Sequence, residues 1–172
     1  NAALKAGVDS IEHGTFLDSS SIALFKNHNT SLIPTLMPGA YVVASMGNNP
    51  FFTDAIKQKA YKASAQSKAG FKIANEAGVR IVFGTDTGVT PHGQNAKEFA
   101  LMVDAGMSPA RAIRAATLGA AEMLGMQDEL GTLEVGKLAD MISVRGDPLA
   151  DISVLESVLT VIKDGKIEKA TR

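Results

Sequence analysis

The sequence contains no cysteine, and this absence limits what could hold a metal. Disulfide bonds and thiolate metal sites are excluded, so any bound metal must use histidine, aspartate or glutamate. Only three histidines are present: His13, His28 and His92. The position of each histidine relative to the strands therefore carries much of the functional information.

The sequence also lacks an excess of charge and any long apolar run. It has 17 basic and 18 acidic residues and a net charge of -1, which gives no electrostatic reason to expect nucleic acid or an anionic membrane as a partner. No apolar run approaches the roughly 20 residues that a membrane-spanning helix needs. Hydrophobic residues make up 45% of the 172 positions, enough for a packed core in one domain or a domain with a small annex.

The amino terminus has neither an initiator methionine nor the charged-then-apolar order of a signal peptide. Residues 2–6 read as the end of a helix, with Gly7 as its C-cap. We therefore expect the chain to be part of a longer polypeptide. Localisation stays open, with the cytoplasm slightly favoured.

Short apolar segments alternate with helical patterns over the first 126 residues. This alternation predicts parallel β/α units, and three such units are too few to close an eight-stranded barrel. We expect strands at 8–12, 31–36 and 80–83. We expect helices after the N-cap residues 18–21, over 52–77, over 98–104 and over 109–124. Residues 37–50 are expected to form a loop.

The pattern changes to short β elements after residue 126. Strands are expected within 131–145 and 158–168, and Asp164-Gly165 is a typical hairpin turn between them. We therefore divide the chain into a partial barrel domain, 1–126, and strands of an accessory domain, 127–172.

Two of the predicted strands end in chemically useful side chains. His13 follows the first strand within Ile11-Glu12-His13-Gly14, and Asp86 follows the third within Phe83-Gly84-Thr85-Asp86. If both strands are parallel, these side chains share the carboxyl edge, where barrel enzymes keep their chemistry. The alternatives are a buried, hydrogen-bonded His13 and an Asp86 that merely caps a turn.

These segments resemble the metal-dependent amidohydrolase superfamily, in its imidazolonepropionase-like and Xaa-Pro dipeptidase-like branch. The resemblance also rests on Thr90-Pro91-His92-Gly93 and on residues 131–141, and it covers nearly the whole chain. It implies the C-terminal part of a (β/α)₈ TIM-like barrel, strands six to eight, plus part of a small accessory β-sandwich. By this resemblance His13 and Asp86 are metal ligands, and the remaining family ligands have no matching position here.

The chemistry that the resemblance implies is hydrolysis of C–N bonds by metal-activated water. The expected cofactor is a divalent metal, zinc, as one or two ions, which lowers the pKa of bound water toward about 7. Asp86 acts first as general base and then as general acid. The expected substrate is a dipeptide or N-acyl amino acid; the alternatives are a cyclic amide of the imidazolone type, or a non-catalytic assembly module with relic site residues.

Candidate substrate-binding residues follow the same strands. His92 and Asn95 lie in the loop after Asp86, Thr35 ends the middle strand, and Tyr41 lies in the expected loop after it. His92 could equally be an exposed loop residue. His28 precedes a strand, so it should lie at the opposite, stability face and has no catalytic role.

The expected partners are a small-molecule substrate, the missing N-terminal part of the same enzyme, and a second copy in a homo-oligomer. An open sheet edge favours pairing with another chain. With only two ligands, against the three that catalytic zinc normally keeps, we expect the 172-residue chain alone to bind metal weakly and to be inactive.

Overall fold

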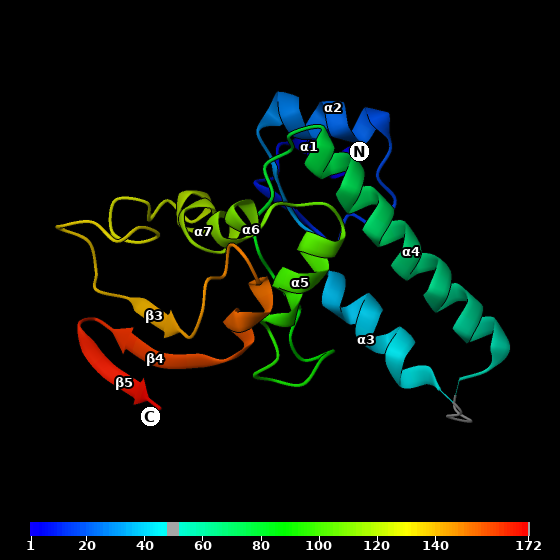
Figure 1. Ribbon diagram of the computed structural model, residues 1–172. Helices are drawn as coiled ribbons and strands as arrows, with labels where there is room; N and C mark the ends of the chain where they lie inside the picture. The colour runs from blue at the N-terminus through cyan, green and yellow to red at the C-terminus, as the bar shows by residue number, and fades with distance from the viewer. Residues whose placement is uncertain (48–51, 172) are drawn as a thin grey trace.

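The computed structural model describes residues 1–47 and 52–171. The first part of the chain contains a small parallel sheet. The helices of this part lie together, and the antiparallel sheet lies to one side of them (Figure 1). Within the described ranges, no helix combines the length and apolar character that a bilayer crossing requires.

Three parallel segments lie side by side in the order of the sequence. β1 (Ser10–Glu12) pairs with β2 (Ser31–Ile33) in parallel, with Ile11 opposite Leu32. On the other side of β2, Leu32 forms a parallel bridge with Ile81. The predicted parallel arrangement of these segments is therefore present, although the third makes only a single bridge. Their carboxyl ends meet at one edge.

The helices next to the sheet begin and end at local sequence signals. α1 (Ala2–Ala6) ends at Gly7, whose φ is 81°. α2 (Ser19–His28) begins at Asp18, whose Oδ1 accepts the Ser21 backbone N–H at 2.7 Å. Hydrogen bonds from Ser20 and Ser21 lower the pKa of Asp18 to about 2. α4 (Asp54–Glu76) and α5 (Lys97–Asp104) also match the prediction.

The predicted loop over 37–50 is wrong for most of its length, because α3 (Leu36–Met46) occupies it. Pro38 lies in the first helical turn, where its missing N–H leaves no helical bond unmade. Gly39 faces α4, and a Cβ there would lie 3.1 Å from Ser64 Oγ. Pro38 and Gly39, which are typical of loops, thus lie in a helix, and this helix packs closely against α4 (Figure 1). Residues 48–50 of the predicted loop lie outside the described residues.

The predicted single helix over 109–124 is two helices, α6 (Pro109–Ala116) and α7 (Leu118–Met123). Thr117 has φ -117° and ψ -99° between them. Its Oγ1 donates to the Ile113 carbonyl at 2.8 Å, and such bonds from Thr to the preceding turn bend helices. The predicted start at Ser108 is confirmed, since its side chain accepts the Arg111 N–H.

The C-terminal segment forms a three-stranded antiparallel sheet of β3 (Met141–Val144), β4 (Val158–Lys163) and β5 (Lys166–Ala170). The predicted hairpin is confirmed, because Asp164 and Gly165 join β4 to β5 with φ of 50° and 73°. The strand expected from Gly131 begins only at Met141. The 3₁₀ helix η1 (Ile152–Glu156) was not predicted.

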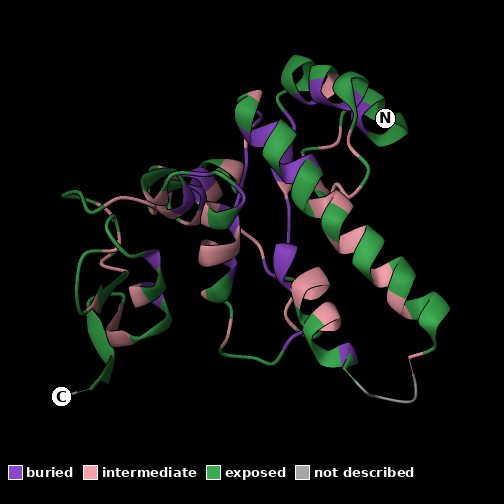
Figure 2. Cartoon of the chain, turned by 45° about the vertical axis from the view of Figure 1, so that its right-hand side comes forward, coloured by how far each residue is buried: buried purple, intermediate pink, exposed green. Residues whose placement is uncertain are grey.

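The core lies between the parallel segments and the helices that cover them. Its most buried members include Phe25, Leu32, Phe71, Met102 and Ala112, each at most 1% exposed. Figure 2 shows buried residues along the inner sides of these helices, whereas the antiparallel sheet is largely exposed. The core therefore packs against the parallel segments, and none of its buried members in the described ranges comes from the C-terminal sheet.

We predict that Gly84→Ala destabilises the protein by about 1–3 kcal/mol, the range for overpacking. A Cβ at Gly84 would lie 2.3 Å from Ile33 Cγ2 on the neighbouring segment. Urea unfolding measures the loss. In an Ile33→Ala background the clash partner is absent, so the added cost of Gly84→Ala should shrink. An equal cost in both backgrounds would contradict the steric explanation.

Candidate metal and catalytic site

The three residues that follow the parallel segments all have a left-handed backbone. The φ values are 68° at His13, 43° at Thr35 and 49° at Asp86. The other two described non-glycine residues with positive φ are Asn29 and Asp164, which end a helix and form a hairpin turn. Left-handed backbone at histidine and β-branched threonine is uncommon, and such strain clusters at functional sites. The carboxyl edge is therefore the candidate site.

His13 is held from two sides at this edge. Its backbone N–H donates to the Ile33 carbonyl at 2.8 Å, and its Nδ1 lies 2.6 Å from Thr35 Oγ1. The side chain is otherwise exposed, so the alternative of a buried histidine does not apply. When Nδ1 carries the proton and donates to Thr35, Nε2 keeps a lone pair for a metal.

Thr35 is the N-cap of α3, yet its side chain makes no capping bond to that helix. The acceptor for the first turn is Glu98 of α5: Oε1 accepts the Leu36 N–H and Oε2 accepts the Met37 N–H, both at 2.8 Å. Glu98 is 0% exposed. Burial raises its pKa to about 7, although the two backbone hydrogen bonds oppose this rise. The sequence predicts Thr35 as a substrate contact, and in the structure its side chain contacts His13.

Glu98 was not singled out from the sequence. An acidic residue in the first turn of a helix is the ordinary complement to the helix dipole, and nothing local distinguishes Glu98 from such a residue. Its partners are 61 and 62 positions away in the chain. Nothing in the sequence signals this role, because Thr35 before residues 36–46 is itself a residue type that commonly caps helices.

Asp86 lies in a turn that Asn95 fastens. Asn95 Nδ2 donates to Thr85 Oγ1 at 2.9 Å and to Thr87 Oγ1 at 2.6 Å, and the two hydroxyls are 2.8 Å apart. Asp86 itself is exposed. The Asn95 amide nitrogen is therefore engaged with the residues on either side of Asp86, and contact between Asn95 and a substrate stays a prediction.

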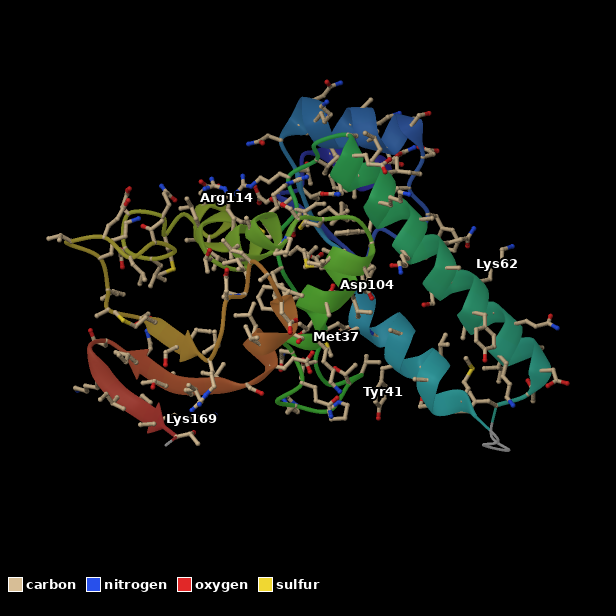
Figure 3. All side chains as sticks on the ribbon, in the orientation of Figure 1. Met37, Tyr41, Lys62, Asp104, Arg114 and Lys169 are labelled. Carbon is tan, nitrogen blue, oxygen red and sulfur yellow. The ribbon has the colours of Figure 1, made fainter. Side chains whose placement is uncertain are left out.

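The other histidines and Tyr41 differ in where they stand relative to the strands. Tyr41 is in α3 rather than in the expected loop, 39% exposed, and projects from this helix away from α4 (Figure 3). His92 is exposed in the loop between Asp86 and α5. His28 ends α2 before β2 begins and so lies at the opposite end of the strands. Substrate contacts of Tyr41 and His92 stay predictions.

The donor set suits part of a metal site. β1 and the Ile81 segment flank β2, so their ends are about 10 Å apart at the usual strand spacing, and two side chains reaching inward could share one cation. An imidazole and a carboxylate are suitable zinc donors. Within residues 1–47 and 52–171, however, no three histidine or acidic side chains gather in a group that could hold a metal. The described residues fit a metal as contributors to a larger ligand set.

Comparison with known proteins finds similar sequences and structures over most of the chain. A solved Xaa-Pro dipeptidase with methionine in its active site is 46% identical, with a TM-score of 0.92 over 98% of this chain and 41% of that one. Ochratoxinase from Aspergillus niger is 35% identical over 98% of this chain and 35% of its own length. Imidazolonepropionase from Symbiobacterium thermophilum is 54% identical over 37 residues, 22% of this chain and 9% of its own length.

The chain thus spans less than half the length of the relatives that it matches. The model of the Amidohydrolase family matches residues 1–167. The predicted resemblance is confirmed: this chain belongs to the amidohydrolase family.

Proposed function

We propose that this chain is the C-terminal portion of a metal-dependent amidohydrolase that cleaves amide or peptide C–N bonds. In this proposal β1, β2 and the Ile81 segment are barrel strands six, seven and eight, and 127–172 belongs to an accessory β-sandwich. The supporting observation is that His13 and Asp86 follow the two outer segments of one parallel sheet, each with a left-handed backbone. Their neighbours Thr35 and Asn95 hold them there.

Each residue of the edge has a distinct role in the proposed reaction. A divalent metal such as zinc, when bound, would lower the pKa of its bound water to about 7. His13 contributes Nε2 as a ligand, with Nδ1 directed to Thr35. The Asp86 carboxylate accepts a proton from the attacking water and returns it to the leaving nitrogen, which is general base followed by general acid catalysis. The hydrogen bonds from Asn95 hold the turn that contains Asp86 in place.

The proposed substrate is a dipeptide or N-acyl amino acid. The support is the likeness to a Xaa-Pro dipeptidase structure and to ochratoxinase. A cyclic amide is the second candidate, favoured by the 37-residue match to imidazolonepropionase. His92 and Tyr41 are the proposed substrate contacts, because both are exposed on segments that leave the carboxyl edge.

The test uses the complete protein that contains this chain, assayed on Xaa-Pro dipeptides, N-acyl amino acids and imidazolonepropionate. We expect turnover of one class, loss of turnover after dialysis against a chelator, and recovery with zinc. His13→Asn should weaken zinc binding by at least the roughly 10- to 100-fold that loss of a ligand's hydrogen-bond partner causes.

His28→Asn is the matched control, because the same exchange is made at the opposite end of the strands. It should leave zinc affinity and turnover unchanged. Turnover that is insensitive to chelation, or zinc affinity that falls equally in both variants, would contradict the proposed site.

A further inference from the structure

Glu98 makes the capping hydrogen bonds at the start of α3 that the Thr35 side chain does not make. At the start of α4 and α6, the N-cap side chains of Thr53 and Ser108 accept a backbone N–H of their own helix. At α3 the N-cap is also a hydroxyl residue, but Thr35 makes no such bond. Both Glu98 oxygens instead accept first-turn N–H groups at 2.8 Å.

This exchange leaves the Thr35 hydroxyl free for another partner. A first helical turn needs acceptors for its unpaired N–H groups, and a threonine at the N-cap ordinarily supplies one of them. With the N–H groups of Leu36 and Met37 taken by Glu98, Thr35 Oγ1 lies 2.6 Å from His13 Nδ1. The left-handed φ of 43° at Thr35 is consistent with a hydroxyl turned away from α3.

We propose that Glu98 is a positioning residue for His13, acting through the first turn of α3 and the Thr35 hydroxyl. Glu98 belongs to α5, the helix that follows Asp86, so the segment after one strand orients the imidazole that follows another. Asn95 is three residues earlier and fastens the Asp86 turn. The beginning of this helix thereby holds both sides of the carboxyl edge. Only the catalytic consequence of the proposal rests on the proposed function.

A double-mutant cycle in the complete protein tests this route. Glu98→Gln removes one acceptor for the α3 turn, and Thr35→Val removes the hydroxyl while keeping a β-branched side chain of similar size. The first readout is the imidazole ¹⁵N chemical shifts of His13 in the metal-free protein, which report its tautomer. The second is zinc affinity, which each single variant should weaken by about tenfold, the lower end of the range for partners of metal-binding histidines.

If Glu98 acts through Thr35, the two variants shift the His13 resonances in the same direction, and the double variant adds little to Thr35→Val. Glu76→Gln, an exposed exchange on α4, is the matched control and should change neither readout. Glu98→Asp keeps the charge but withdraws the carboxylate, so it should reproduce the shift if Glu98→Gln does not fold.

His13 resonances unchanged in folded Glu98→Gln and Glu98→Asp, or full additivity with Thr35→Val, would overturn the proposal. The chemical shifts need neither bound metal nor turnover. A protein that lacks hydrolase activity but shows the coupled shift would therefore contradict the proposed function and keep the positioning role.

Discussion

Asp86→Asn should lower kcat of the complete protein by about 100- to 10,000-fold, the usual contribution of general acid–base catalysis. An amide has nearly the shape of the carboxylate but cannot take a proton from water or return it to the leaving nitrogen. Asparagine also tolerates left-handed backbone better than most residues. The φ of 49° at this position therefore adds no new strain, and the loss can be assigned to chemistry rather than to unfolding.

Steady-state kinetics with metal analysis of the same sample measures this effect. Asp164→Asn is the matched control, because Asp164 has a φ of 50° in the β4–β5 turn, far along the chain from the site. That control should keep wild-type turnover and unfolding midpoint. If Asp86→Asn turns over at the wild-type rate with stoichiometric metal, Asp86 does not carry the proton.

Glu98 should make stability fall as pH rises from about 4.5 to above 7. Burial raises the folded pKa to about 7 from 4.5, so in this window the folded protein retains a proton that the unfolded chain has released. The folded state is therefore favoured at the low end of the window, and the advantage is lost as pH passes through the folded pKa. The difference corresponds to about 3 kcal/mol of unfolding free energy.

Urea unfolding of wild type and Glu98→Gln across pH 4 to 8 isolates this contribution. Glutamine does not titrate, so the wild-type free energy minus that of the variant should decrease by about 3 kcal/mol with rising pH. If the unfolding free energy of wild type minus that of Glu98→Gln instead increases with pH, the prediction is wrong.

Local signals in the sequence were sufficient to predict where several helices begin or end and where the hairpin turns. Asp18 and Ser108 marked helix starts, Gly7 marked a helix end, and Asp164-Gly165 marked the hairpin. These residues act on backbone groups within a few positions, so their effect can be read without knowing the rest of the fold. The positions of His13 and Asp86 after strands were predicted on the same local grounds.

The errors occurred where a distant neighbour decided the conformation. Residues 36–46 contain Pro38 and Gly39, which are typical of a loop, but Gly39 allows close contact with Ser64 and the helix is capped by Glu98. The break at Thr117 is a local exception, because its hydroxyl bonds to the Ile113 carbonyl only four residues earlier, and such bonds bend helices. At residues 36–46, propensity favoured the wrong result because the competing contacts form only in the folded chain.

The sequence by itself determined the family and the alternation of strands and helices, because spacing and residue type are written along the chain. It also predicts the two side chains that we propose as metal ligands. Only the tertiary structure decided how those side chains are held. The contact of His13 with Thr35, the Asn95 bonds around Asp86 and the buried Glu98 beneath α3 join separate elements. A hydrogen bond needs its two atoms within about 3 Å, and folding alone brings such distant residues together.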